Sequence, residues 1–272
     1  MKRLVHAVAP RPWVNFAWNL AADLGEIGQR VSDPRPRPWR VVHNVGGGDF
    51  YATGGAFFAL FRDAVALKDD ACVLDIGCGA GRLAVPICNH LGSRGRYIGF
   101  DIAPRALDFA RTHVRGACAI EFVHADLANA EYARRGERAD SYRFPAADAS
   151  VDAALATSLF SHILPDVAVH YLSEAGRVLK PGGRLMLTAF LVTQADRKRP
   201  GAARLKLEPY GEMAFAADPR HPERAIGFDE TSFLSWVEAA GLIVAGDVHR
   251  GDWRAPAATG GEFQDRLVLE KV

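Results

Sequence analysis

The sequence predicts an α/β fold in which a mostly parallel sheet is covered by helices. Between residues 71 and 192, short apolar runs of strand length alternate with stretches of helical periodicity, the pattern of repeated strand–helix units. A glycine-rich turn directly follows the first of these runs. The chain has 272 residues, 49% of them hydrophobic, which is enough for one such domain with additions.

Each apolar run defines one expected strand. The five strands of the alternating region are Cys72–Ile76, Tyr97–Asp101, Ile120–His124, Ala153–Thr157 and Arg184–Leu191. A later helix is predicted over Glu230–Ala240, because Asp229 is a good N-cap residue and Gly241 a good helix stop. After this helix, Leu242–Val248 and Arg266–Glu270 are expected to close the sheet as an antiparallel hairpin.

Two segments depart from the alternation and are expected to be additions. Residues 1–50 contain five of the 15 prolines, and an amphipathic helix is predicted around Trp13–Val31. Seven Lys/Arg against three acids in residues 1–40 give a local charge of +4, and these basic side chains are expected to face solvent or an anionic substrate. Residues 193–226 are predicted to be an inserted substrate loop over the carboxyl ends of the strands.

Composition excludes several classes of protein. Lys+Arg 33 against Asp+Glu 32 gives a net charge of +1, which argues against nucleic-acid binding. No apolar run approaches the roughly 20 residues of a membrane span, and the N-terminal apolar stretch is too short for a signal peptide. The four cysteines form no CxxC pair, which favours reduced thiols and a cytoplasmic location. No clustered ligand set predicts a metal.

The glycine-rich turn spans Val73–Arg82. An apolar strand ends near Asp75 and turns through three alternate glycines into a helix, so that the backbone can approach a ligand closely. A dinucleotide fingerprint would need glycine at Arg82, and no G-K-[ST] of a P-loop follows. The Asp75 carboxylate would repel a pyrophosphate and suits a ligand that carries an ammonium or sulfonium group.

Polar residues also follow the next three strands. Asp101 ends the second strand, where an acid can bind both hydroxyls of a ribose. Asp126 follows the third strand, where an acid can meet an adenine amino group, and Ser158 follows the fourth. Four such strand ends together are more specific than any one motif.

With these motifs and the Leu179–Gly183 turn, the chain resembles the class I S-adenosylmethionine-dependent methyltransferases, closely over residues 70–192 and more loosely to Val272. The resemblance implies a Rossmann-like seven-stranded sheet in the order 3-2-1-4-5-7-6, with strand 7 antiparallel and helices on both faces. It implies S-adenosyl-L-methionine as cofactor, S-adenosyl-L-homocysteine as product, and a methyltransferase domain over residues 51–272 behind an N-terminal cover segment, residues 1–50.

The resemblance also assigns cofactor contacts by position. It implies that Asp75 and the glycine turn bind the amino-acid part of the cofactor. Asp101 and Ile102 would bind the ribose, and Asp126 and Leu127 the adenine. Arg82 could reach the cofactor carboxylate or equally pair with a surface acid. Because 26 residues separate Asp126 from the fourth strand, Asp148 could replace it, although Asp126 is favoured since it directly follows a strand. The full set is Asp75, Gly77, Cys78, Gly79, Gly81, Arg82, Asp101, Ile102, Asp126, Leu127 and Ser158.

His162 is the predicted general base, because it follows the fourth strand and a neutral hydroxyl acceptor must lose its proton as the methyl group arrives. The alternative is that His162 only caps or packs the following helix. Candidate substrate contacts come from the additions and from loop aromatics, which are often packing anchors instead. They are His43, Phe50, Tyr51, Tyr132, Tyr210, His221 and Trp253.

The flanking motifs at residues 43–50, 157–162 and 251–265 resemble a bacterial subgroup associated with glycan and polysaccharide methylation. O-methylation of a sugar or glycan hydroxyl is therefore the leading hypothesis. The alternatives are a small-molecule natural-product or quinone-type O/C/N-methyltransferase, and a cofactor-binding partner subunit without catalysis. A homodimer is also compatible with the N-terminal helix. An NAD-dependent oxidoreductase is disfavoured by Asp75 and the missing fingerprint.

Overall fold

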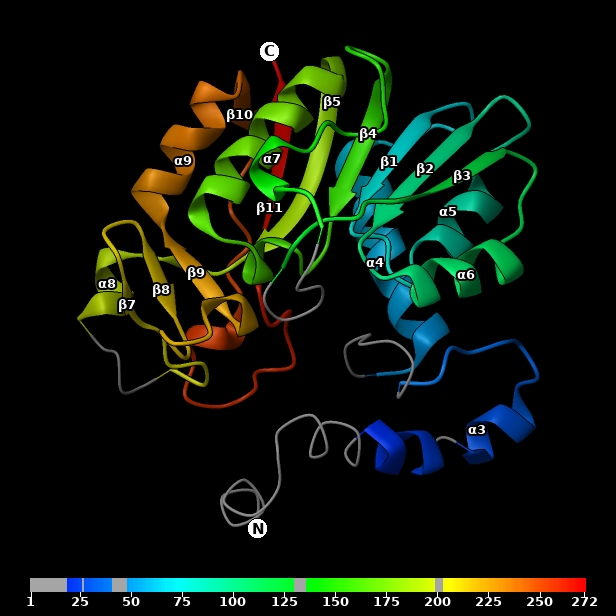
Figure 1. Cartoon of the computed structure of the whole chain (residues 1–272), viewed down its shortest axis with the longest axis horizontal. Helices are drawn as coiled ribbons and strands as arrows, with labels where there is room; N and C mark the ends of the chain where they lie inside the picture. The colour runs from blue at the N-terminus through cyan, green and yellow to red at the C-terminus, as the bar shows by residue number, and fades with distance from the viewer. Residues whose placement is uncertain (1–18, 26, 41–47, 130–135, 199–202) are drawn as a thin grey trace.

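A computed structural model describes residues 19–25, 27–40, 48–129, 136–198 and 203–272. The main sheet has seven strands in the order β10-β11-β5-β4-β1-β2-β3 (Figure 1). The strands are β1 (Cys72–Ile76), β2 (Arg96–Asp101), β3 (Ala119–His124), β4 (Val151–Ala156), β5 (Leu179–Ala189), β10 (Leu242–Val244) and β11 (Asp265–Lys271). Counted along the chain, this is the predicted order 3-2-1-4-5-7-6.

The strand directions also agree with the prediction. The pairs β1–β2, β2–β3, β1–β4 and β4–β5 are parallel, whereas β11 runs antiparallel to both β5 and β10. The α/β fold class and the antiparallel closing hairpin are therefore confirmed. The second strand of the hairpin, β11, includes the predicted segment Arg266–Glu270. The first strand is shorter than the predicted Leu242–Val248, since β10 ends at Val244.

Helices cover both faces of this sheet (Figure 1). On one face, α4 (Phe50–Val65), α5 (Ala84–His90) and α6 (Pro104–His113) pack on strand residues such as Val73. On the other face, α7 (Pro165–Val178) and α9 (Glu230–Ala239) pack on the alternate residues such as Leu74. Because both faces are buried, the strands are nearly continuous apolar runs, which made them recognisable.

The segment predicted as an inserted loop, residues 193–226, forms part of a second sheet together with the residues that flank it. Its strands are β6 (Leu191–Val192), β7 (Glu208–Tyr210), β8 (Ala214–Ala216) and β9 (Ile226–Asp229), in the order β6-β9-β8-β7. The expected strand Arg184–Leu191 is divided, since β5 ends at Ala189 and Leu191 begins β6. Strands of two to four residues show too little alternation to be read from sequence. The short helix α8 (Gln194–Arg197) follows β6.

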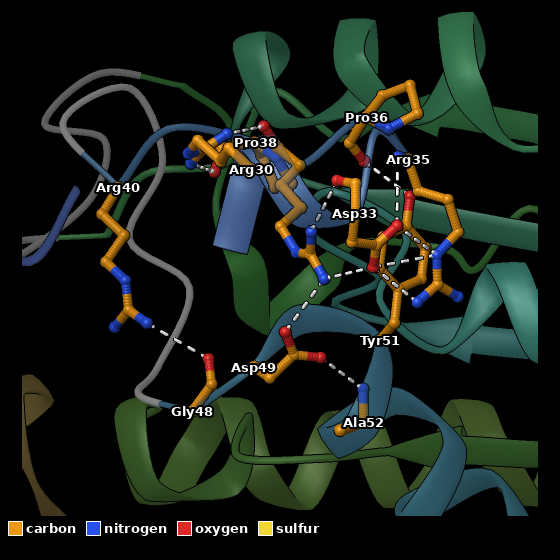
Figure 2. A network of polar contacts seen from close by, with 11 residues as sticks. Arg30, Asp33, Arg35, Pro36, Pro38, Arg40, Gly48, Asp49, Tyr51 and Ala52 are labelled. Carbon is orange, nitrogen blue, oxygen red and sulfur yellow. Dashed lines mark hydrogen bonds and ion pairs between the residues drawn. The ribbon is translucent and has the colours of Figure 1, made fainter. Parts of the chain in front are cut away.

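The described part of the N-terminal segment is helical at residues 19–25 and in α3 (Ile27–Ser32), and then extended to Arg40. The aromatic residues predicted to begin its amphipathic helix, Trp13 and Phe16, lie outside the described residues. A polar network joins the extended stretch to the start of α4, as Figure 2 shows.

The expectation that the basic residues of this segment face solvent is wrong for Arg37 and Arg30. Arg37 is 8% exposed and donates to Asp33 Oδ2 (2.6 Å) and Asp49 Oδ2 (3.1 Å). Arg30 donates to the carbonyl oxygens of Arg37 (2.8 Å) and Pro38 (3.1 Å). An extended, proline-rich stretch makes no ladder of its own, so its carbonyl groups need donors from side chains. Within the described ranges, no helix is both long and apolar enough to cross a bilayer.

Candidate active site

A pocket lies at the edge of the main sheet where the carboxyl ends of β1 to β4 meet. Four of the predicted cofactor residues line it, together with the predicted base His162. They are Gly77 after β1, Asp101 and Ile102 at the end of β2, and Leu127 after β3. The parallel arrangement brings these strand ends together, as expected for an α/β sheet.

The glycine turn is held against the end of β2 by backbone hydrogen bonds. The amides of Gly77 and Cys78 both donate to the carbonyl oxygen of Phe100, at 2.9 and 3.0 Å. Gly81 has a φ of 79°, and a Cβ there would lie 2.9 Å from Val114 Cγ2. By contrast, a Cβ on Gly79 would meet nothing within 4 Å, so the space above Gly79 is open to a ligand.

The Asp101 carboxylate is fixed by the same turn. Its Oδ2 accepts from the amide of Gly79 and its Oδ1 from the amide of Ala103, both at 2.8 Å. Burial raises the pKa of Asp101 above its ordinary value, and these amide bonds act against the rise. Asp101 therefore lines the pocket in one defined orientation.

Asp75 lies beneath the turn and is 2% exposed. Its Oδ2 accepts a hydrogen bond from Tyr97 Oη at 2.7 Å, and among the described residues no donor reaches Oδ1. Burial raises its pKa to about 7, the Tyr97 bond lowers it, and the nearby Asp101 charge adds to the rise. A buried carboxylate with one unused oxygen and no cation from the described chain fits the ammonium group of an amino-acid moiety.

The other predicted cofactor residues are not among those that line the pocket. Asp126 is exposed at the end of β3, whereas Asp148 lies before β4, at the opposite edge of the sheet, and pairs with Arg177. This placement supports Asp126 over Asp148. Cys78 is buried, and the Arg82 guanidinium lies 5.7 Å from the centre of the Phe50 ring.

Ser158 begins the loop that follows β4. It has a φ of 57°, unusual for a residue other than glycine, and its amide donates to Thr188 Oγ1 at 2.7 Å. Thr188 donates to Gln264, Gln264 to Ser161, and Ser161 back to the carbonyl oxygen of Ser158. This closed ring fixes the loop that carries His162.

His162 ends this loop in a short 3-10 helix (Phe160–His162). Its Nδ1 lies 2.9 Å from the carbonyl oxygen of Glu223, which comes from the insertion. Because a carbonyl oxygen only accepts, Nδ1 carries the proton in the neutral ring and Nε2 is the basic nitrogen. The imidazole is thus set in the tautomer that a general base requires.

Several pocket residues were missed by sequence reasoning. Asn129 donates to Glu223 Oε1 at 2.8 Å and to the carbonyl oxygen of His162 at 3.3 Å, so it links β3, β4 and the insertion. Leu159 lies against Gly77, and Tyr171 of α7 closes one side. Asn129 follows the end of β3 and could have been found by the rule that ligands bind at the carboxyl ends of parallel strands. Glu223 lies 61 residues beyond His162 in an irregular segment, and nothing in its sequence context indicates the site.

The predicted substrate residues that the structure describes do not line this pocket. Phe50 packs on Ala80 beside the glycine turn, and Tyr51 donates to the carbonyl oxygen of Pro36 at 2.6 Å. Trp253 is 2% exposed and donates to Asp265, so it is a packing anchor. Tyr210 lies in β7, and His221 contacts Asp218 at 3.1 Å. His43 and Tyr132 lie outside the described residues.

A second, larger cavity of about 880 Å³ lies on the small sheet and is lined by Val192, Phe215 and Trp253. It shares no lining residue with the pocket at the strand ends. Two of its lining residues, Lys198 and Ala203, flank a stretch outside the described residues. In the described part of the chain, no group of three or more His, Cys, Asp or Glu side chains is arranged to hold a metal ion.

Comparison with known proteins agrees with this geometry. A family model described as a methyltransferase domain matches residues 73–183. Nocamycin O-methyltransferase of Saccharothrix syringae is 31% identical over 230 residues, which cover 78% of this chain and 75% of that protein. Arsenite methyltransferase of Aquipseudomonas alcaligenes is 32% identical over 174 residues, 61% of this chain and 46% of that protein.

The chain covers less of some other relatives, for example 34% of an uncharacterised 37.1 kDa transposon protein of Streptomyces fradiae. Among solved structures, geranyl diphosphate C-methyltransferase of Streptomyces coelicolor aligns over 80% of this chain and 76% of its own, with a TM-score of 0.54 and 13% identity. A methyltransferase of Methanosarcina mazei aligns over 76% of this chain and 94% of its own, with a TM-score of 0.50 and 24% identity. These two similarities establish the fold.

Proposed function

Because the chain belongs to the class I S-adenosylmethionine-dependent methyltransferases, we propose that it methylates a hydroxyl group of a small-molecule acceptor, with His162 as the general base. The family membership itself means that the protein is an enzyme whose methyl donor is S-adenosylmethionine. The observation that carries the proposal is the His162 ring, which lines the pocket with Nδ1 bonded to a carbonyl oxygen and Nε2 basic.

The pocket residues fit this cofactor. Asp75 would pair with the ammonium group through its unused oxygen, and the open space above Gly79 would admit the amino-acid part. Asp101 would accept from the ribose hydroxyls, Ile102 and Leu127 would give the adenine an apolar surface, and Asp126 would meet its amino group. When bound, S-adenosylmethionine supplies an electrophilic methyl group on a sulfonium sulfur.

In the proposed mechanism, His162 Nε2 takes the proton from the acceptor hydroxyl as the oxygen becomes nucleophilic. The ring through Thr188 and Gln264 holds the loop of His162, while the Glu223 carbonyl oxygen holds its ring. Apolar side chains such as Leu159 and Tyr171 exclude water from the pocket. Positioning of this kind supplies much of the rate enhancement in a displacement reaction.

The identity of the acceptor class rests on the relatives. The relative matched over 78% of this chain is a nocamycin O-methyltransferase, which favours a small-molecule acceptor over a glycan. None of the relatives reported above is named for a glycan or polysaccharide. A carbon or nitrogen acceptor is the second candidate, because the arsenite methyltransferase and the geranyl diphosphate C-methyltransferase reported above are named for acceptors other than a hydroxyl group. The insertion and the N-terminal segment are proposed to select the acceptor, since Glu223 of the insertion already lines the pocket.

The proposal is tested first by calorimetry and then by transfer of a labelled methyl group. S-adenosylhomocysteine should bind and NAD should not; tight NAD binding would contradict the cofactor site. Labelled S-adenosylmethionine should then modify members of a hydroxylated small-molecule panel, with free sugars and glycans, amines and carbon acids as parallel panels. Transfer confined to glycans would restore the glycan hypothesis, and a stoichiometric requirement for a second subunit would favour a non-catalytic role.

A further inference from the structure

Tyr97 carries a buried phenol that the proposed mechanism does not yet use. It lies in β2, is fully buried, and packs beside Phe122 with ring centres 5.6 Å apart. Its hydroxyl donates to Asp75 Oδ2 at 2.7 Å. A buried phenol needs a polar partner, and a carboxylate makes the stronger, charge-assisted bond.

The register of the sheet explains how the phenol reaches this carboxylate. Asp75 of β1 is paired with Gly99 of β2, so Tyr97, two residues earlier on β2, lies on the same face and diagonal to Asp75. A Cβ on Gly99 would lie 2.9 Å from Tyr97 Oη and from Cys78 Sγ. Glycine at this position therefore leaves the space through which the hydroxyl meets the carboxylate.

The bond makes the two oxygens of Asp75 different. Oδ2 is engaged by Tyr97, whereas Oδ1 accepts no hydrogen bond from the described residues. The titratable groups that face this pair are the Asp101 carboxyl at the end of β2, the Cys78 thiol in the turn and, from α5, the Cys88 thiol. None of these is a cation, and the described residues form no ion pair with Asp75. A cationic group of a bound ligand would therefore stabilise the ionised form of Asp75.

We infer that Tyr97 is a positioning residue for the cofactor: its hydroxyl favours the ionised form of Asp75 and orients the carboxylate so that Oδ1 receives the ammonium group of the amino-acid moiety. This inference rests on the cofactor site proposed above. It assigns no contact between Tyr97 and the cofactor, because the phenol acts through Asp75 from below the sheet end.

A comparison of two ligands separates this role from simple packing. S-adenosylhomocysteine carries the amino-acid moiety and 5′-methylthioadenosine lacks it, so only the first should depend on the Tyr97 hydroxyl. We expect Tyr97→Phe to weaken S-adenosylhomocysteine binding about tenfold near pH 7, since a hydrogen bond to a charged group is lost, with 5′-methylthioadenosine binding unchanged. Tyr142→Phe, which removes a phenol elsewhere in the core, is the matched control and should alter neither affinity.

The pH dependence gives a second readout. Affinity for S-adenosylhomocysteine should be full above the pKa of Asp75 and should fall as the carboxyl becomes protonated below it. Tyr97→Phe removes a donor that favours the ionised form, so the midpoint of this fall should move to higher pH, by about one unit. Calorimetry between pH 6 and 8 measures both quantities.

The outcomes that would overturn the inference are distinct. Equal weakening of both ligands would mean that Tyr97 only supports packing, and an unmoved midpoint with unchanged affinity would remove any role. Should Tyr97→Phe fail to fold, Asp75→Asn must still weaken S-adenosylhomocysteine selectively, and no selectivity would overturn the inference. A wild-type protein that binds neither ligand would contradict the cofactor site itself, and the inference with it.

Discussion

At the scale of single residues, His162 has the most direct consequence for activity. We expect His162→Ala to lower turnover by about 10²- to 10⁴-fold while S-adenosylhomocysteine affinity changes little, because a general base acts on the acceptor and not on the cofactor. Labelled methyl transfer and calorimetry measure the two effects. His113→Ala on the exposed end of α6 is the control. Unchanged turnover on the true acceptor would remove His162 as base and favour a carbon or nitrogen nucleophile.

Asp75 predicts an unusual pH dependence of stability in the protein without ligand. Its folded-state pKa of about 7 lies above the value of an unfolded aspartate, so the folded state binds the extra proton between these values. The resulting stabilisation is complete below about pH 4 and is lost as pH rises through 7, an effect of about 4 kcal/mol at most. Asp75→Asn cannot titrate at this position. The free energy of unfolding of the wild type minus that of Asp75→Asn should therefore fall as pH rises from about 4 to 7. A difference that is constant from pH 4 to 8 would contradict it.

The predicted cofactor residues that line the pocket share one property: they lie at the end of a strand or in the segment directly after it. Asp101 and Leu127 line the pocket because parallel strands end at one edge, and apolar runs reveal where they end. Tyr97 and Glu223 could not be found in this way. The role of Tyr97 depends on the strand register that places it diagonal to Asp75, and that of Glu223 on the path of an irregular segment.

At the scale of elements, the glycine turn divides into a structural and a ligand-facing part. Gly81→Ala places a Cβ 2.9 Å from Val114 Cγ2 in a left-handed conformation, and we expect it to cost about 2–4 kcal/mol of stability. Gly79→Ala meets nothing within 4 Å, so its cost should be near the 1 kcal/mol of left-handed strain alone, with a loss of cofactor affinity instead. Urea unfolding and calorimetry separate the two. Equal stability losses would show that the space above Gly79 is not reserved for a ligand.

The elements of the main sheet were predictable to within a few residues, whereas those of the insertion were not. Strand β1 matches its predicted bounds, and α9 begins at its predicted cap, where Asp229 accepts from the amide of Ser232 at 3.0 Å. These elements are set by local signals. The small sheet depends on pairing between short segments that are separate in sequence, such as β6 with β9, and such pairing leaves little local pattern.

At the scale of the whole molecule, Asp265 joins the two sheets. It begins β11 and is fully buried. It accepts from the amide of Leu191, where β6 begins, and from the amide of Gly251, at 2.9 and 2.8 Å. The Trp253 indole and the Arg254 guanidinium also donate to it. In the sequence, Asp265 stands only at the end of the motif at residues 251–265. Its role in joining the sheets could not be predicted, because its partners lie up to 74 residues away.

We therefore expect Asp265→Ala to destabilise the protein by about 3–5 kcal/mol, because it leaves the Arg254 charge and several donors without their acceptor. The loss should begin in the small sheet, since the hydrogen bonds of Asp265 hold the start of β6 and residues 251–254, so hydrogen exchange should accelerate in β6 to β9 before it does in β1 to β4. Glu121→Ala, which removes an exposed pair with Arg96 on the far side of the main sheet, should cost no more than about 1 kcal/mol.

Because Glu223 reaches His162 from the insertion, loosening of the small sheet should also lower turnover at temperatures where the main sheet remains folded. Uniform acceleration of exchange across both sheets would mean that they unfold as one unit and that Asp265 does not act as the joint between them.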